Sequence, residues 1–321
     1  MRPPGHAARL VVLATLTLLA TPAALAGPLR DRLMERRAAQ QNESFAENAS
    51  GDTARANLQN VRVVLDIAYG SEPLQRFDVY APQPAVKDAP VILMVHGGAW
   101  SKGDKRSTGV FENKVAHWVS RGFILISANY RLLPAATPLQ QAEDIARALA
   151  VAQQKAAEWG GDRTKFVLMG HSAGAHLVAL LAALPMLAQN AGAAPWLGTI
   201  ALDSAAYDMS QIMAEKHYRF YDQAFGSDPA YWRATSPIHV MQVAPAPFLA
   251  VCSSTRPDHP CRQAQAFVQR ARGLGAQASV LEQALSHGEI NQQLGRQPEY
   301  TAAVEAFMRT LDASLAQRLK E

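Results

Sequence analysis

Short apolar runs alternate with longer amphipathic segments along most of this chain. The runs at 61–67 and 75–80 contain polar residues at alternate positions, which is typical of antiparallel or edge strands. Six later runs are almost wholly apolar, which indicates strands buried on both faces: 91–95, 123–128, 166–169, 199–202, 247–251 and 279–283. The segments between them predict helices at 111–121, 138–159, 173–188, 261–274 and 300–316. This alternation predicts an α/β fold with a mostly parallel, eight-stranded sheet flanked by helices.

The sharpest local pattern is Gly170-His-Ser-Ala-Gly174, which lies directly between a predicted strand and a predicted helix. Five residues are too few for a relaxed connection, so the central Ser172 must adopt a strained backbone conformation. Its hydroxyl would then project beside the first amide groups of a helix, which favour nearby negative charge. We predict that Ser172 is a nucleophile; the alternative is an ordinary turn with a surface serine.

A second glycine-rich turn, His96-Gly-Gly-Ala-Trp100, follows the apolar run at 91–95. An attacking serine needs donors for the oxyanion that develops on a substrate carbonyl, and main-chain N–H groups serve where small residues allow close approach. Gly98 and Ala99, with Ala173 after the nucleophile, are the predicted oxyanion donors. The alternative is a glycine turn without a catalytic role.

Two further turns supply a candidate acid and a candidate base. Asp258 follows the run at 247–251, and His287 follows the run at 279–283. The chain order serine, acid, histidine is that of an α/β-hydrolase triad, in which His287 would take the serine proton and Asp258 would orient the imidazole. Asp203 and Asp208 follow the preceding strand and are competing candidates for the acid. No histidine spacing matches a metal site, and no metal is expected.

Cys252 and Cys261 flank the predicted acid loop. In an exported protein an isolated pair of cysteines favours a disulfide, which here would close a loop around Asp258. The alternative is two free, buried thiols.

Residues 203–247 form the least sheet-like stretch and are rich in aromatic side chains: Tyr207, Tyr218, Phe220, Tyr221, Phe225, Tyr231 and Trp232. The stretch is predicted to be a lid between the sixth and seventh strands that offers apolar surface to a substrate. Aromatic residues also commonly pack in cores, so these rings could instead attach the insertion to the body. Trp100, His171 and Tyr207 are the candidate substrate-binding residues.

The N-terminus predicts a secretory signal peptide over 1–26, with an apolar core too short to span a bilayer and a small-x-small cleavage pattern. Cleavage of this segment would remove two arginines, so the formal net charge would fall from +4 to +2. We therefore expect a periplasmic or secreted protein without a stable membrane span. Residues 27–60 predict a helical or poorly ordered extension, and 61–321 the catalytic domain. No dense basic run indicates nucleic-acid binding.

Three motifs together resemble the α/β-hydrolase superfamily: His96-Gly-Gly-Ala-Trp100, Asn129-Tyr-Arg-Leu-Leu-Pro134 and Gly170-His-Ser-Ala-Gly174. The chain is most similar to hormone-sensitive-lipase-like esterases, feruloyl-esterase-like (BD-FAE type) carboxylesterases and arylformamidases. Ala99 and His171 depart from the hormone-sensitive-lipase pattern and move the resemblance toward the other two groups. The resemblance implies a serine carboxylesterase that needs no cofactor and acts on small-to-medium acyl or aryl esters. An arylformamidase-like amidase and a non-catalytic binding protein of the same fold are the alternatives.

Overall fold

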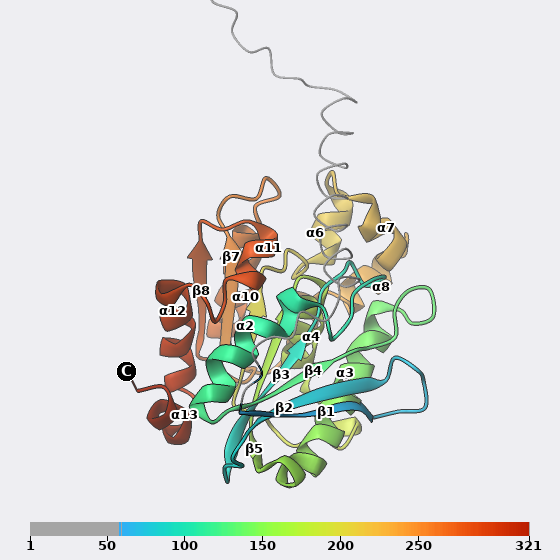
Figure 1. Ribbon diagram of the computed structural model, residues 1–321. Coiled ribbons are helices and arrows are strands. Elements are labelled where there is room, and N and C mark those ends of the chain that lie inside the picture. The colour runs from blue at the N-terminus through green and yellow to red at the C-terminus, as the bar shows by residue number, and fades with distance from the viewer. Residues whose placement is uncertain (1–57, 59, 321) are drawn as a thin grey trace, which may run out of the picture.

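All eight predicted strands are present, and they form one sheet (Figure 1). The computed structural model describes residue 58 and residues 60–320, so the predicted signal peptide and nearly all of the predicted extension lie outside the described residues. The strand bounds are β1 Val61–Ala68, β2 Arg76–Pro82, β3 Ala89–Val95, β4 Ile124–Ala128, β5 Gly161–His171, β6 Gly198–Leu202, β7 Phe248–Ser253 and β8 Ala278–Gln283.

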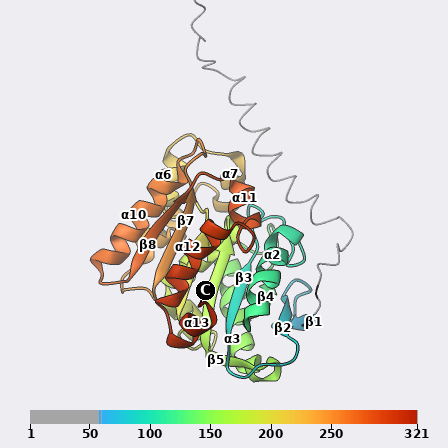
Figure 2. The same ribbon diagram turned by 60° about the vertical axis from the view of Figure 1, so that its left-hand side comes forward.

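The strands lie in the order β1-β2-β4-β3-β5-β6-β7-β8. Strand β2 is antiparallel to both β1 and β4, as its alternating sequence predicts, and every pairing from β4 to β8 is parallel. Figure 2 shows the two ends of this order, with β1 and β2 on one side and β7, β8 and α10 (Pro260–Gly273) on the other. The carboxyl ends of β3, β5, β6, β7 and β8 therefore share one edge of the sheet.

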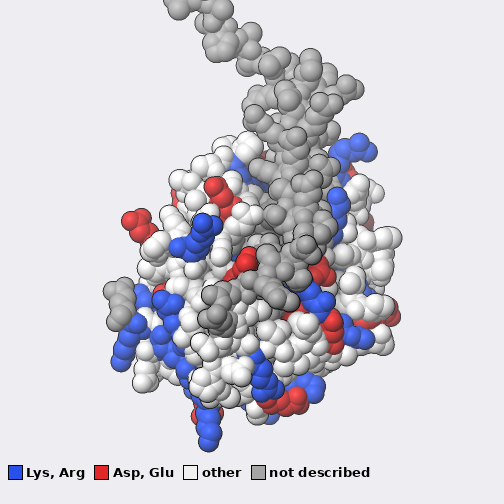
Figure 3. All heavy atoms as spheres, viewed as in Figure 1, with Lys and Arg blue, Asp and Glu red and all other residues white. Residues whose placement is uncertain are grey.

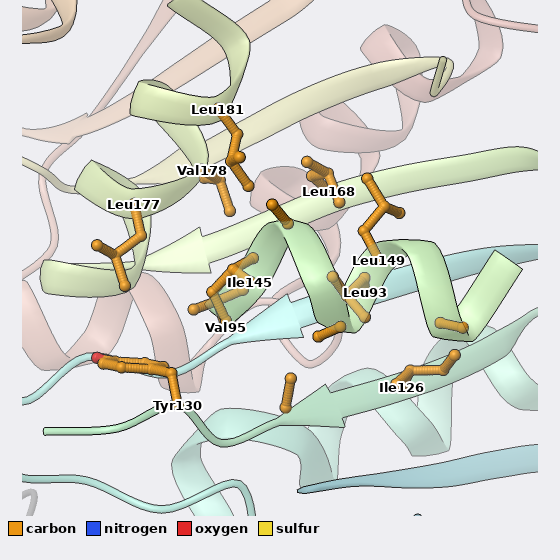
Figure 4. Close-up of a cluster of buried hydrophobic side chains, with 14 of the residues drawn as sticks. Leu93, Val95, Ile126, Tyr130, Ile145, Leu149, Leu168, Leu177, Val178 and Leu181 are labelled. Carbon is orange, nitrogen blue, oxygen red and sulfur yellow. The ribbon is translucent and has the colours of Figure 1, made fainter. Parts of the chain in front are cut away.

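Helices cover both faces of the sheet, because the central strands are mostly apolar and are buried at every position. On one face α3 (Pro138–Lys155) and α4 (Ala173–Ala183) pack against β3, β4 and β5, as Figure 4 shows for Leu93, Ile145 and Leu177. Helix α10 extends this layer over β7. On the other face α2 (Thr108–Trp118), α12 (Pro298–Arg309) and α13 (Ala313–Arg318) bury the alternate strand residues.

Two predicted helices are interrupted in the structure. The helix that starts at Ala173 ends at Ala183, and α5 (Pro185–Asn190) follows, because Pro185 cannot donate the amide hydrogen bond that a continuous helix needs. The helix expected at 300–316 is divided into α12 and α13, with Asp312 capping the second piece. The 203–247 insertion holds four short helices: α6 Met209–Ala214, α7 Arg219–Phe225, α8 Pro229–Ala234 and α9 Pro237–Val240.

Acidic and basic side chains are both distributed over the face of the molecule in Figure 3. Across residue 58 and residues 60–320, every helix is too short or too polar to cross a bilayer.

Candidate active site

Ser172 lies at a tight turn between β5 and α4. Its backbone has φ 56° and ψ −118°, a conformation that L-residues rarely adopt, and its N–H donates to Leu202 O at 2.9 Å. The neighbouring glycine turn approaches closely, since a Cβ on Gly97 would lie 2.8 Å from Ser172 Cβ. The strained turn that the sequence predicts is therefore present, and it presents the serine at the carboxyl edge of the sheet.

His287 is the first residue of α11 (His287–Gln292). The helix begins there because Ser286 and Glu289 form a capping box, in which each side chain accepts from the other residue's main-chain N–H. The imidazole is 9% exposed, and its Nε2 lies 2.9 Å from Ser172 Oγ. The structure thus joins the predicted nucleophile and the predicted base.

The carboxylate that contacts His287 belongs to Asp203, not to Asp258. Asp203 Oδ2 lies 2.6 Å from His287 Nδ1, and Asp203 Oδ1 accepts from Ser253 N at 2.8 Å. The Asp203 side chain is fully buried, at the end of β6. The prediction that Asp258 orients the imidazole is therefore wrong, and the competing candidate Asp203 has that position.

The strand order explains this correction. Strand β6 pairs directly with β5, which leads to Ser172, whereas β7 is one strand further away. Ser172 N donates to the carbonyl of Leu202, the residue before Asp203, so the turn after β6 lies directly beside the turn that holds the serine. Asp208, the other competitor, caps α6 through Gln211 N and contacts His239.

Asp258 instead forms a bidentate ion pair with Arg256, which the sequence analysis did not select. Arg256 Nε donates to Asp258 Oδ1 at 2.9 Å, and Nη2 donates to Asp258 Oδ2. Arg256 Nη1 donates to Asp203 Oδ2 at 2.8 Å and lies 2.9 Å from His287 Nδ1. No motif marks this arginine; the one available signal was its place in the loop between the two cysteines.

The same contacts set the charge of Asp203. Burial by itself raises the pKa of the Asp203 carboxyl, but the Arg256 charge and the His287 hydrogen bond outweigh burial and hold the pKa below its usual range. Asp203 is therefore a carboxylate at neutral pH. Because a carboxylate only accepts, the proton in its contact with His287 resides on Nδ1, which leaves Nε2 unprotonated and able to accept from Ser172.

Two of the three candidate substrate-binding residues lie away from the cavity lining. His171 is 1% exposed, and its Nε2 lies 2.9 Å from His287 O, so it contacts the backbone of the helix that holds the base. Tyr207 is fully buried and packs against Phe248 and Phe267. The predictions for His171 and Tyr207 fail for the same reason. Each residue is close to a site residue in the sequence, but its side chain points into the protein body.

The cavity beside Ser172 has a volume of about 310 Å³. Trp100, the third candidate, lines it together with Ala99 and Ala173 from the two predicted oxyanion turns. The insertion contributes an aromatic wall, and the loop after β7 contributes the opposite side; these residues are Tyr218, Phe220, Tyr221, Arg256, Pro257 and Asp258. A second hollow of about 610 Å³ shares part of this lining and continues between α6 and α10.

The glycine turn after β3 holds unusual backbone conformations. Ala99 and Trp100 have positive φ values of 49° and 59°, and Gly98 has a φ of 119°. The turn is fixed at its far end, where Lys105 N donates to Asn129 Oδ1 at 2.6 Å and Ser127 Oγ donates to Lys105 O at 2.8 Å. Strain at positions held this firmly is typical of functional turns.

Helix α11 is also anchored by α2, which packs in the same apolar cluster. Lys114 of α2 is 1% exposed, and its Nζ donates to Asn291 O at 2.7 Å and Asn291 Oδ1 at 2.8 Å. Burial lowers the pKa of this ammonium to about 7. The contact fixes the helix one turn beyond His287.

The predicted disulfide is present between Cys252 and Cys261. Cys252 lies in β7 and Cys261 in α10, so the bond closes the loop that holds Arg256 and Asp258. Among the described residues, metal-ligand side chains also gather where Glu282 approaches these sulfur atoms, but both sulfurs are already bonded to each other.

Comparison with known proteins supports this architecture. The BD-FAE family model matches residues 77–270. Esterase LipC of Mycobacterium tuberculosis (strain ATCC 25618 / H37Rv) is 28% identical over 271 residues, which cover 79% of this chain and 67% of LipC. Esterase LipQ of the same organism is 31% identical over 199 residues, which cover 59% of this chain and 47% of LipQ. The match therefore spans about half of LipQ.

Solved structures share the fold at low sequence identity. Esterase B from Lactobacillus rhamnosis superposes with a TM-score of 0.67 at 19% identity, over 90% of this chain and 95% of that chain. The thermophilic esterase Est2 from Thermogutta terrifontis gives a TM-score of 0.63 at 18% identity, over 79% and 93% of the two chains. The fold and these relatives define an α/β-hydrolase of the carboxylesterase class. Since its family model matches more than half of the sequence, the chain belongs to the BD-FAE family.

Proposed function

We propose that this hydrolase cleaves carboxylic esters through a covalent acyl-enzyme, with Ser172 as nucleophile, His287 as base and Asp203 as acid. One observation carries the proposal: the continuous contact from Ser172 Oγ to His287 Nε2 and from His287 Nδ1 to Asp203 Oδ2. Nucleophile, base and orienting carboxylate within hydrogen-bonding distance are the arrangement that activates a serine.

In the first half-reaction Ser172 Oγ attacks the ester carbonyl carbon while its proton passes to His287 Nε2. The new oxyanion faces the main-chain N–H groups of Gly98, Ala99 and Ala173. When the tetrahedral adduct collapses, the bond from carbonyl carbon to alkoxy oxygen breaks, and His287 returns the proton to the leaving alcohol. Water then attacks the acyl-enzyme by the same route, which releases the carboxylic acid and restores the serine.

The cavity favours esters of small-to-medium acyl or aryl groups. Its volume of about 310 Å³ suits a short acyl chain or one ring, and Tyr218, Phe220 and Tyr221 offer flat apolar surface. The adjoining hollow leaves space for a larger substituent beyond the scissile bond. The insertion acts in this proposal as a wall of the cavity and as a candidate lid.

We also propose that the protein is exported from the cytoplasm. The sequence pattern of residues 1–26 and the disulfide between Cys252 and Cys261 both suit an oxidising compartment. N-terminal sequencing of the protein recovered from the periplasm or medium tests it, and a chain that begins at residue 27 is the expected product.

The catalytic proposal is tested with a panel of p-nitrophenyl and aryl esters of increasing acyl length. Wild-type protein should hydrolyse the shorter esters, and a fluorophosphonate probe should label Ser172. Ser172→Ala should abolish labelling and lower kcat by about 10⁴-fold or more. Faster turnover of N-formylkynurenine than of any ester would identify an amidase instead, and absence of labelling would indicate a binding protein.

A further inference from the structure

Arg256 occupies a central place among the charged groups beneath His287. Its guanidinium bridges two carboxylates: Nη1 contacts Asp203, while Nε and Nη2 contact Asp258. Its side chain is 14% exposed. A buried cation held by two anions with this geometry has little freedom to move, because both planar groups fix its orientation.

The geometry also fixes Asp203. Each carboxylate oxygen of Asp203 has a donor from the β7 side: Ser253 N contacts Oδ1, and Arg256 Nη1 contacts Oδ2. Oδ2 is the same atom that meets His287 Nδ1 at 2.6 Å. Without Arg256 the carboxylate would keep one neutral anchor and could rotate away from the imidazole.

We propose that Arg256, held by Asp258 in the disulfide-closed loop, is a positioning residue for the serine hydrolysis proposed above. It acts through Asp203, keeping that carboxylate ionised and aligned with His287. Asp258 acts indirectly, because its bidentate ion pair fixes the guanidinium of Arg256, which in turn contacts Asp203. This assignment gives the loop after β7 a role even though its aspartate does not touch the histidine.

The positive charge of Arg256 should affect the pH dependence of activity, which can be measured. Arg256 Nη1 lies 2.8 Å from Asp203 Oδ2, so its positive charge favours ionisation of Asp203. This effect extends activity toward acid pH, because the proposed reaction needs an ionised Asp203. The other titratable or charged groups near Asp203, Arg256 and His287 are His171, Lys114, Tyr207, Tyr218, Tyr221, Asp258 and Tyr300.

The test uses Arg256→Ala and Arg256→Lys in the full chain. We expect Arg256→Ala to lower kcat by about 10- to 100-fold and to change KM by a smaller factor, since the aromatic wall of Tyr218, Phe220 and Tyr221 remains although Arg256 itself lines the cavity. The acid limb of its kcat/KM profile should move up by roughly one to three pH units. Guanidinium ion at tens of millimolar, far below denaturing concentrations, should restore part of kcat. Arg256→Lys keeps the positive charge but loses the planar, bidentate geometry of the guanidinium. This variant should retain the wild-type acid limb and show a reduced kcat.

Arg131→Met is the matched control, because Arg131 forms a bidentate ion pair with the buried Asp144 through Nε and Nη2, and this pair lies outside the contacts between Asp203, Arg256 and His287. It should lower stability without moving the acid limb, and guanidinium should not change its kcat. If Arg256→Ala behaves like this control, or if it keeps wild-type kcat and pH dependence, the inference is wrong. If Arg256→Ala does not fold, loss of the wild-type acid limb in Arg256→Lys would overturn it. Failure of the proposed function is distinct, because wild-type protein itself would then leave esters intact.

Discussion

Two charge clusters of this fold differ in how their charges balance. The loop cluster joins Lys105 and Arg106, in the loop after β3, to Asp66 of β1 and Asp78 of β2 through ion pairs of 2.6–2.9 Å. The relay cluster, below the imidazole, consists of Asp203, Arg256 and Asp258. Two cations meet two carboxylates in the first cluster, whereas one cation meets two carboxylates in the second.

The difference separates a structural function from a chemical one. The loop cluster is neutral by itself, and it fixes the chain where the glycine turn joins α2. The relay cluster keeps one excess negative charge, which the imidazolium of His287 would neutralise at the proton transfer proposed above. Removing a charge should therefore change stability most in the loop cluster and kcat most in the relay cluster.

The largest expected effect is on kcat, and it should differ between the two aspartates of the relay cluster. Asp203→Asn should lower kcat by about 10⁴-fold, because an amide can donate to Nδ1 and stabilise the wrong tautomer of His287. Asp258→Asn should lower kcat by about 10-fold or less, since it loosens the arginine without touching the imidazole. Steady-state kinetics on one p-nitrophenyl ester compares the two. Equal losses would contradict the assignment of Asp203 as the acid.

In the loop cluster, Lys105→Met should destabilise the fold by about 3–5 kcal/mol, because Asp78 stays fully buried after losing a cation. Urea denaturation measures this loss. The kcat of the molecules that remain folded should fall far less than in Asp203→Asn. A large fall in kcat at unchanged stability would show that the two clusters do not differ as proposed.

Acid should destabilise the fold through buried histidines near the glycine turn. His176 accepts from Trp100 Nε1 at 3.2 Å and donates to Thr235 O at 2.8 Å, and burial lowers the pKa of its imidazole to about 4. The unfolded histidine binds a proton below about pH 6.5, so stability should decline as pH falls from 6.5 to 4, by on the order of 3 kcal/mol for this group.

Urea unfolding of wild type and His176→Gln across that pH interval measures the contribution. The variant should be less stable at pH 7 but should show a shallower decline toward pH 4. Parallel curves for the two proteins would mean that His176 titrates alike in the folded and unfolded states.

The smallest effect concerns the disulfide that closes the Arg256 loop. Replacing Cys252 and Cys261 by alanine should cost about 2.5 kcal/mol, since the bond spans nine residues and restricts the unfolded chain. The acid limb of the pH profile should remain near wild type if the ion pairs alone hold Arg256 in place. A shift toward the Arg256→Ala profile would show that the bond itself positions the arginine.

Most of the fold follows from local pattern. Every apolar run predicted as a strand is a strand, and the elbow at Ser172 and the start of α11 at His287 follow from short motifs whose backbone requirements are local. The helices were predicted less well where proline interrupts an apolar surface, as at Pro185. The disulfide was also correctly predicted from two cysteines and an expected export signal.

The sequence by itself determined the layered α/β fold, the tight turn at Ser172 and the start of α11 at His287, because each depends on residues adjacent along the chain. Only the tertiary structure decided which carboxylate meets the imidazole, which arginine holds that carboxylate, and which aromatic rings face the cavity. Those choices depend on the lateral order of the strands and on the side toward which each loop turns. Asp203 meets the imidazole because β6 pairs with the strand that leads to the serine and Ser172 N donates to Leu202 O, which brings the turns after β5 and β6 side by side.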